Sequence, residues 1–324
     1  MRLSERLKKN YSLEDRHAIV FCLIMIGIPF VAFLVFWAYV NFSSILLAFQ
    51  DDYGKFTFDN ILQVFKTFTG ETEELYIESI PKQSLGSILG RTVLLWFLVN
   101  VVCVLPSMIS SYILYKKIIG HYVFRMIFMI PSILAGIVWV SIMKKMVDPN
   151  GPVIALGQAL GINFSADVLR SGLLVSLRTS FATIVVLNVL PHIVGFNIII
   201  SGAYARRPNE LFEVGRLEGL GFLKEFFLVS VPLVWPTVVV CMIGNFASVF
   251  TFDGQVYLYT ELQYNTGTIG SYLYLLTAKI SNSNQAVNSY GYPAAVGVVL
   301  TAMTIPVVLI GKYGLEKAVE PVEY

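Results

Sequence analysis

"NELFEVGRLEGLGFLKEFFLVSVPLVWP", residues 209–236, is the segment from which the organisation of the whole chain follows. It places four glutamates, an arginine, a lysine and three glycines directly before an apolar run. The chain around it is 56% hydrophobic and only 14% charged, so this charged stretch is unusual. The contrast predicts a short polar helix outside an apolar environment, followed by a helix within that environment.

The bulk composition is that of an integral membrane protein. The 324 residues have a mean hydropathy of +0.70, and uncharged stretches of about 20 residues, enough to span a bilayer, recur along the chain. We therefore expect an all-α, polytopic membrane protein with six transmembrane helices. The predicted spans are 18–40, 91–115, 122–143, 172–200, 228–251 and 293–313.

Several other classes and ligands are disfavoured. The net charge of +2 and the lack of a basic stripe argue against nucleic-acid binding. The three cysteines lie in apolar runs without ligand spacing, so we expect neither a metal site nor a disulfide. The run 18–40 is long enough to span and lacks a small-x-small cleavage site, so we interpret it as a retained anchor helix.

The basic residues orient the predicted spans. A cytoplasmic N-terminus places most Lys and Arg residues inside, as the positive-inside rule requires, although Lys144, Lys145, Arg170 and Arg178 fall outside or at the edge. We expect both termini in the cytoplasm. The predicted parts are an N-terminal segment 1–17, a transmembrane domain 18–315 with a cytoplasmic loop at about 205–227, and a tail 316–324.

Two outer segments carry local signals. Loop 50–86 contains the acidic run "ETEELYIE" (71–78) and is by default a solvated loop, with capping of the pore or contact with a soluble partner as alternatives. The segment "DPNGP" (148–152) predicts a turn, and a short interfacial helix is expected at 154–160.

Within 209–221 the residues predict a short amphipathic helix. Asn209 suits the N-cap, Glu210 suits the positive end of the first turn, and Gly219 and Gly221 are expected to end the helix. The apolar members of this helix are Leu211, Phe212, Val214 and Leu217, and the charged ones after Glu210 are Glu213, Arg216 and Glu218. A helix of about ten residues is about 15 Å long, which suits insertion into a groove on a partner.

The same residues resemble a known family. Glu213-Val-Gly-Arg-Leu-Glu-Gly219, followed by Val229-Ser-Val-Pro232, is similar to the EAA loop of ABC importer permeases, whose pattern is roughly E-A-A-x-x-x-G and later I-x-L-P. The usual alanines are here Val214 and Gly215, and the usual D-G is Glu218-Gly219. These departures are conservative in size, and we expect them to loosen the helix.

Further segments narrow the resemblance to carbohydrate permeases. "HYVFRMIFMIPSILAGIVWVSIM" (121–143), "YNTGTIGSYLY" (264–274) and "YGYPAAVGVVL" (290–300) look like the corresponding regions of the first permease of maltose-type oligosaccharide importers. The G-G-P that the family has before the second segment is absent. Together the matches cover roughly residues 90–315.

The resemblance implies a type I ABC importer permease fold in a bacterial or archaeal cell membrane. It further implies a second homologous permease, two ATPase subunits that bind ATP and Mg, and an extracellular substrate-binding protein that delivers the sugar. In that family the EAA loop is a coupling helix that docks on the ATPase. The positions carried over to this role are Glu210, Phe212, Glu213, Arg216, Glu218 and Gly219. The chain contains no G-x-x-x-x-G-K-[ST], so we expect no catalysis and no cofactor in this chain itself.

Polar residues within spans are candidates for substrate contacts. Asn245, Ser248, Val249 and Phe252 have helical i, i+3, i+4, i+7 spacing and are predicted to share one face. Span four adds His192 and Gly195 next to Pro191. In maltose-type permeases the sugar contacts fall on these six positions, where the identities here differ. The alternative is that His192 and Asn245 only bond across helices. Asp253, at the outer end of span five, is expected to meet either substrate or water.

Other transporters remain alternatives. A secondary transporter is expected to carry intramembrane carboxylates or inverted repeats, and neither is visible. No filter-like loop indicates a channel, and neither H-E-x-x-H nor G-x-S-x-G indicates a hydrolase. The nearest alternative is an ABC permease for a polyamine or an anion, and the matches after residue 260 favour a carbohydrate.

Overall fold

The computed structural model describes residues 13–51, 53–69, 84–206, 210–282 and 290–318. Within these ranges it is helical, with a single isolated bridge between Gln50 and Phe56 and no strand, so the predicted all-α class is confirmed. The chain divides into two compact units, 1–61 with 286–298 and 62–285 with 299–324, which are described separately. The acidic run 71–78 and Asn209 lie outside the described residues.

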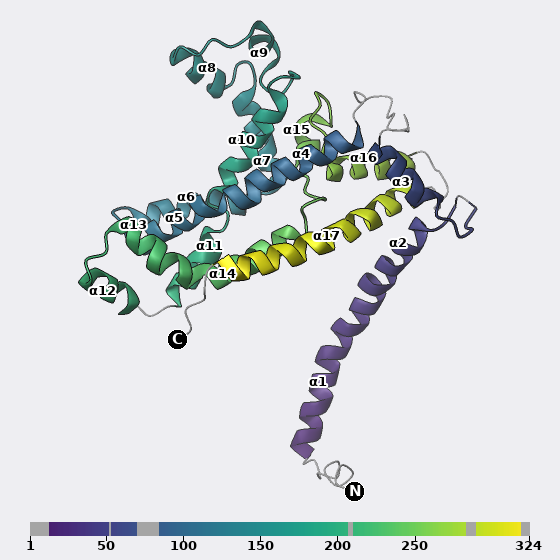
Figure 1. Ribbon diagram of the computed structural model, residues 1–324, viewed down its shortest axis with the longest axis horizontal. Coiled ribbons are helices and arrows are strands. Elements are labelled where there is room, and N and C mark those ends of the chain that lie inside the picture. The colour runs from purple at the N-terminus through teal and green to yellow at the C-terminus, as the bar shows by residue number, and fades with distance from the viewer. Residues whose placement is uncertain (1–12, 52, 70–83, 207–209, 283–289, 319–324) are drawn as a thin grey trace. The chain divides into compact units, whose positions relative to one another are not determined.

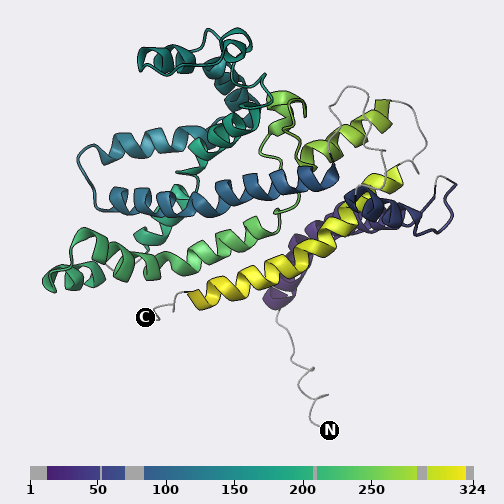
Figure 2. The same cartoon turned by 45° about the horizontal axis from the view of Figure 1, so that its top comes forward.

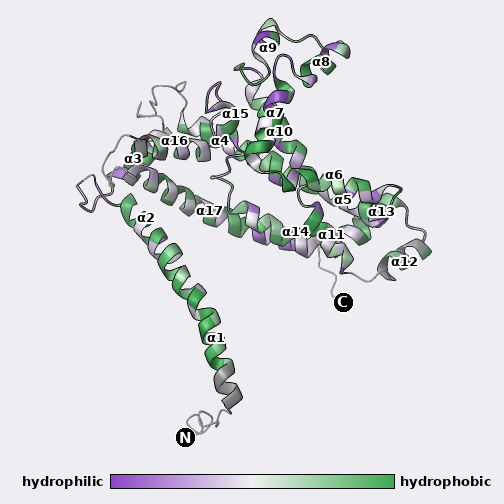
Figure 3. Ribbon diagram, turned by 180° about the vertical axis from the view of Figure 1, so that it is seen from behind, coloured by the Kyte–Doolittle hydropathy of each residue, from purple (hydrophilic) through white to green (hydrophobic). Residues whose placement is uncertain are grey.

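The first unit contains the N-terminal span Ala18–Ala48. It consists of α1 (Leu13–Ala32), a π-helical segment (Phe33–Tyr39) and α2 (Val40–Ala48), and Figure 3 shows hydrophobic residues along most of its length. The helix continues past the predicted end at residue 40. Asn41 Nδ2 and Ser44 Oγ each donate to a main-chain oxygen one turn back, at 2.7 and 2.8 Å, so these polar residues are satisfied inside the helix.

A close contact with the backbone in the first unit explains why the segment 290–300 has a glycine at position 291. The amide Nδ2 of Asn60, near the start of α3 (Asp59–Thr69), donates to the Gln50 main-chain oxygen at 2.8 Å. A Cβ placed on Gly291, the first residue of α17 (Gly291–Ala318), would lie 2.6 Å from that amide nitrogen. Only glycine permits this approach of α17 to the loop.

The second unit holds two long spans whose ends differ from the predicted ones. One joins α4 (Leu85–Phe97), a π-helical segment (Leu98–Val102) and α5 (Val104–Tyr115). It starts before the predicted residue 91 because Ser84 caps it by accepting from the Ser87 amide. The other joins α13 (Phe222–Glu225), a π-helical segment (Phe226–Ser230) and α14 (Val231–Phe246). Residues 222–227 are therefore the first part of this helix, which ends before the predicted residue 251.

Two predicted spans are broken in the structure. The predicted span 122–143 is divided into α6 (His121–Ile133) and α7 (Gly136–Val147), and the chain bends by 105° between His121–Ile133 and the stretch Gly136–Ala159. The predicted span 172–200 begins only at Ser180 and is divided into α10 (Ser180–His192) and α11 (Asn197–Ala205). Residues 172–179 form turns instead of helix.

The break between α10 and α11 is supported by serines of α5. Pro191 has no N–H to continue the helix, and the chain turns through residues 193–196. Ser107 Oγ then accepts from the Phe196 amide at 3.1 Å, and Asn197 Nδ2 donates to Ser110 Oγ at 2.9 Å. Partners from a neighbouring helix are the usual way to satisfy a broken helix inside a membrane.

Shorter helices complete the chain. The turn predicted at 148–152 is present, because the Gly151 amide donates to the Asp148 oxygen at 2.8 Å, and a helix follows it close to the predicted 154–160. These short helices are α8 (Pro152–Ala159), α9 (Ala166–Ser171), α12 (Glu210–Leu217), α15 (Val256–Thr260) and α16 (Ile269–Asn282). Among the described residues five helices are long and apolar enough to span a membrane, or six when the bent pair counts as one.

Two hydrophobic clusters hold the second unit together. In Figure 2 the α4–α5 helix lies between α6 and the α13–α14 helix, and Figure 1 agrees. The tyrosine cluster consists of Met108, Tyr112, Ile200, Ala203, Tyr204, Phe212, Phe226, Leu233, Val234, Val238 and Met242. The valine cluster consists of Leu95, Val99, Val140, Val147, Leu174, Ile184, Leu187, Val256 and Tyr259. The α4–α5 helix and the pair α10 and α11 each contribute residues to both clusters, whereas the α13–α14 helix contributes to the tyrosine cluster.

Candidate functional site

The short helix α12 lies at one end of the second unit, where the buried ring of Phe212 attaches it. Figure 1 shows it beyond the start of α13, away from the long helices. Phe212 is 3% exposed and belongs to the tyrosine cluster. Its ring centroid lies 4.9 Å from that of Tyr115 and 6.4 Å from that of Tyr204. Burying a phenylalanine contributes roughly 1.5–3 kcal/mol, so Phe212 anchors the helix to the ends of α5 and α11.

The remaining described side chains of α12 and its end face outward. Glu213, Val214 and Leu217 are exposed, Leu217 by 89%, and Glu218 follows them. A large apolar side chain so fully exposed at a helix tip, next to two carboxylates, has the composition of a contact surface. Glu210 and Arg216 also lie on α12, but their side chains are outside the described part.

Gly219 ends α12 as predicted, and the reason is conformational. Its φ is +74°, in the left-handed region that side chains with a Cβ rarely adopt. The Leu220 amide donates to the Gly215 oxygen at 3.0 Å, which is the long bond of a Schellman motif. Gly221 has an ordinary φ and precedes α13 instead of stopping α12. With eight residues, α12 is about 12 Å long, shorter than predicted.

A cavity of ≈ 300 Å³ lies between the two hydrophobic clusters along the long helices. It brings together three of the predicted substrate residues, His192, Gly195 and Asn245, at the break between α10 and α11 and the end of α14. The other lining residues are Asn100, Phe128, Pro131, Ser132, Pro191, Val194, Phe196 and Ile198. Amides, a hydroxyl and ring faces are the groups that recognise a neutral polar molecule.

Asn245 carries an unused donor at this cavity. Its side-chain nitrogen is buried and has no hydrogen-bond partner among the described residues. Leaving a buried donor unpaired costs about 1–3 kcal/mol, so such a group usually has a reason to be there. His192, by contrast, already uses Nδ1, which lies 2.7 Å from the Asn188 main-chain oxygen.

The predicted shared face of Asn245, Ser248, Val249 and Phe252 is wrong. Helix α14 ends at Phe246, and residues 247–251 form turns, so the i, i+3, i+4, i+7 spacing does not align these side chains. The Asn245 main-chain oxygen accepts from Trp96 Nε1 and from Ser248 Oγ, both at 2.9 Å. These side-chain donors occupy the carbonyl that helix continuation needs. Val249 is buried, and Phe252 packs against the valine cluster.

Asp253 is held by hydroxyl groups. Its Oδ1 accepts from Thr268 Oγ1 at 2.8 Å and from Ser271 Oγ. Both hydroxyls belong to the segment 264–274, which was singled out for its family resemblance. The carboxylate therefore has a structural role in joining this segment to the end of span five, a role that neither expectation for Asp253 included.

Sequence reasoning missed Asn100, which is 6% exposed and lines the cavity from the α4–α5 helix. The signal was available, because an amide inside a long apolar run follows the same rule that selected Asn245. Phe128 and Ser132 had no such signal. They reach the cavity only because α6 packs beside α5, which the sequence does not show.

Three known permease proteins are similar to this chain in sequence. The chain is 22% identical over 299 residues (89% of it, 80% of the relative) to the diacetylchitobiose uptake system permease protein NgcF of Streptomyces coelicolor. It is 23% identical, over 76% of it and 81% of the relative, to the probable ABC transporter permease protein YurN of Bacillus subtilis. It is 26% identical, over 65% of it and 69% of the relative, to the multiple sugar-binding transport system permease protein MsmF of Streptococcus mutans.

Two solved structures have the same fold. One is a bacterial ABC transporter involved in the import of the acidic polysaccharide alginate, with a TM-score of 0.71, 16% identity and coverage of 97% of this chain and 99% of that one. The other is the alginate transporter in complex with an alginate pentasaccharide-bound periplasmic protein, with a TM-score of 0.72, 15% identity and full coverage of both chains. No family model matches the sequence. The resemblance predicted from residues 213–232 is thereby confirmed.

Proposed function

We propose that this chain, whose relatives are sugar ABC transporter permeases and whose fold is that of an ABC importer permease, forms half of the translocation pathway of an ATP-driven carbohydrate importer. Its partners are a second homologous permease, two ATPase subunits that bind ATP and Mg, and an extracellular substrate-binding protein. The chain spans a cell membrane with both termini and α12 in the cytoplasm. It performs no catalysis itself.

The observation that carries this proposal is the form of α12. The buried ring of Phe212 attaches it, while Glu213, Val214, Leu217 and Glu218 remain exposed. Burying an exposed leucine in a partner's groove contributes about 1.5–3 kcal/mol, so Leu217 is the natural anchor. The two carboxylates then select a groove with basic side chains. We assign Glu213, Glu218 and Leu217 to docking on the ATPase, with Gly219 fixing the end of the helix.

The cargo contacts we propose are those at the cavity. Asn245 supplies the unpaired donor, and Asn100, His192 and Ser132 supply further polar groups. Phe128 offers a ring face suited to the C–H surface of a sugar. Ser248, Val249 and Phe252, by their placement, support the shape of this region instead of contacting the sugar. A cavity of ≈ 300 Å³ is at the small end for ligand sites, consistent with one or two sugar units bound here at a time.

The test is reconstitution of the complex. The chain is purified with the subunits that remain associated, inserted into liposomes with ATP and Mg at the ATPase side, and supplied with the substrate-binding protein and a panel of sugars. The panel includes diacetylchitobiose, malto-oligosaccharides and alginate oligosaccharides, with a polyamine and a sulfate control. We expect ATP-dependent uptake of one carbohydrate class and stimulation of ATP hydrolysis by the loaded binding protein.

Other results would replace the proposal. Uptake of the polyamine or sulfate alone would assign the chain to an ABC permease for another solute. Transport by the chain alone, indifferent to ATP, would indicate a secondary transporter. The double variant Glu213→Ala, Gly219→Leu is expected to insert normally and to lose transport, and normal uptake by it would contradict the docking role of α12.

A further inference from the structure

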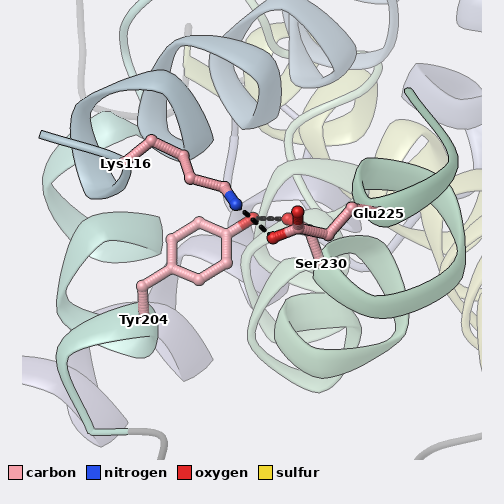
Figure 4. Close-up of polar contacts among 4 residues, drawn as sticks. All are labelled: Lys116, Tyr204, Glu225 and Ser230. Carbon is pink, nitrogen blue, oxygen red and sulfur yellow. Dashed lines mark hydrogen bonds and ion pairs between the residues drawn. The ribbon is translucent and has the colours of Figure 1, made fainter. Parts of the chain in front are cut away.

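A buried ion pair lies at the base of α12. Lys116, directly after α5, contacts the carboxylate of Glu225 at the end of α13, and Figure 4 shows the two side chains pointing toward each other. The side chains are only 16% and 4% exposed. Two further ion pairs, Lys145 with Asp148 and Lys312 with Glu316, are much more exposed, and each joins residues within one turn. The pair at α12 therefore differs in burial and in sequence separation.

The lysine of this pair also contacts the anchor of α12. Lys116 Nζ lies 5.8 Å from the centroid of the Phe212 ring and 5.4 Å from that of Tyr112. Both distances are within the range of a cation–π contact. One ammonium group thus joins three elements: the end of α5 through Tyr112, α12 through Phe212, and α13 through Glu225.

A second buried contact fixes the other side of the same region. The Tyr204 hydroxyl, near the end of α11, is hydrogen-bonded to Ser230 Oγ at the end of the π-helical segment, beside the ion pair in Figure 4. Tyr204 is 1% exposed, and its ring stacks on Tyr115 with centroids 5.1 Å apart. The Tyr204 bond therefore joins α11 to the π-helical segment that continues α13, and the Lys116–Glu225 pair joins α13 to the end of α5.

A buried pair of this kind contributes little net stability, because the cost of removing two charges from water offsets their attraction. Such pairs are better explained by the geometry that they fix. Here the pair fixes the attachment of α12 to α5. The helix of α5 is itself continuous with the π-helical segment Leu98–Val102, whose Asn100 lines the cavity. The pair thus lies on a continuous path from the helix tip to the polar cavity.

We propose that Lys116 and Glu225 are positioning residues that hold α12 rigidly against α5, so that a displacement of α12 moves the helix that lines the cavity. This inference rests on the proposed function, because it assigns a role in the coupling of ATP hydrolysis to transport. Neither residue contacts the ATPase or the sugar. Both act through Phe212 and the tyrosine cluster.

The test measures sugar transported per ATP hydrolysed in the reconstituted complex. In Glu225→Gln the ammonium keeps its place but loses its charged partner, and we expect the ratio to fall at least about tenfold while ATP hydrolysis stays within about twofold. Lys116→Arg, which keeps the charge, is expected to retain most of the ratio. Lys117→Met and Lys224→Met, neighbouring exposed lysines, are matched controls and are expected to keep the parent ratio.

Hydrogen exchange on the purified chain provides the second measurement, which does not depend on assembly. With Glu225→Gln we expect faster exchange in α12 and unchanged exchange in α14. Equal acceleration in both helices, or a parental transport ratio in Glu225→Gln, would overturn the proposal. A parent complex that fails to couple ATP to carbohydrate uptake contradicts the proposed function instead, and the exchange experiment still decides whether the pair holds α12.

Discussion

The base of α12 and the cavity at Asn245 are built on opposite principles. Around Phe212 the aromatic rings of Tyr115 and Tyr204 and the Lys116–Glu225 pair are closely packed and partnered. Around Asn245 two helices end or break, a cavity of ≈ 300 Å³ opens and an amide donor has no partner among the described residues. The first region is suited to transmitting movement, and the second is suited to receiving a ligand.

The difference bears on how the two proposed roles are encoded. A coupling element must be rigid in its attachment, which agrees with the recognisable spacing of Glu, Gly and Pro in and after α12. A site for varied cargo needs only a few polar groups at a place where helices stop. The following predictions test this contrast, from the largest expected effect to the smallest.

Phe212→Ala should abolish transport. The ring is 3% exposed and packs among aromatic side chains. Removing a buried phenylalanine lowers the free energy of unfolding by about 3–5 kcal/mol, and a helix as short as α12 is not stable without its tertiary packing. We expect loss of the ATPase from the purified complex, measured by co-purification. Phe227→Ala is the control, since Phe227 is 55% exposed in the π-helical segment directly after α13. Retained ATPase in Phe212→Ala would show that the ring does not anchor α12.

Leu217→Asp should weaken ATPase capture at least about tenfold without changing the thermal stability of the chain. The side chain is 89% exposed, so the unbound chain loses no packing, whereas a docked leucine contributes about 1.5–3 kcal/mol. The measurement is ATPase binding to the chain in detergent, with Leu217→Met as the conservative control. A fall in thermal stability with unchanged capture would assign Leu217 to folding.

Asn245→Leu should reduce uptake of the transported sugar by about tenfold and change the order of preference among sugars. The substitution removes the unpaired donor, worth about 1–3 kcal/mol when it bonds to a sugar hydroxyl, but leaves Trp96 bonded to the main-chain oxygen. Uptake is measured across the panel at equal amounts of complex. An unchanged preference with unchanged uptake would remove Asn245 from the substrate site.

Gly219→Val should reduce transport severalfold more than Gly219→Asn. No atom lies within 4 Å of a Cβ placed at this position, so only the φ of +74° opposes a side chain. Left-handed backbone costs roughly 1–2 kcal/mol for most residues and less for asparagine, and a β-branched residue fits it worst. Equal transport by both variants, measured in liposomes, would mean that the end of α12 does not depend on this conformation.

Ser248→Ala should leave transport within about twofold of the parent. The Ser248 hydroxyl donates to the Asn245 oxygen, which Trp96 also satisfies, so its loss leaves no buried acceptor unpaired. The variant is assayed beside Asn245→Leu at equal amounts of complex. A large loss would restore Ser248 to the substrate site that the helical spacing predicted.

Much of the fold follows from local properties of the sequence. The spans follow from the length of apolar runs, and α12 follows from charges and glycines that a bilayer does not accept. Gly219 was predicted to end α12 because the left-handed conformation is a property of the residue itself. The position of Asn245 at a polar site was likewise predicted from its type, since an amide inside a span is costly.

What the sequence by itself determined is therefore the resemblance to ABC importer permeases, the approximate positions of the apolar segments and the short charged helix α12. The tertiary structure alone decided where helices break and which side chains then meet. Trp96 lies far from Asn245 in the chain, and its bond to the Asn245 oxygen helps to end α14 before Ser248. The pairing of Lys116 with Glu225 depends on the packing of α5 against the π-helical segment Phe226–Ser230, which follows Glu225. These contacts join residues 149 and 109 positions apart, and spacing along one helix carries no information about them.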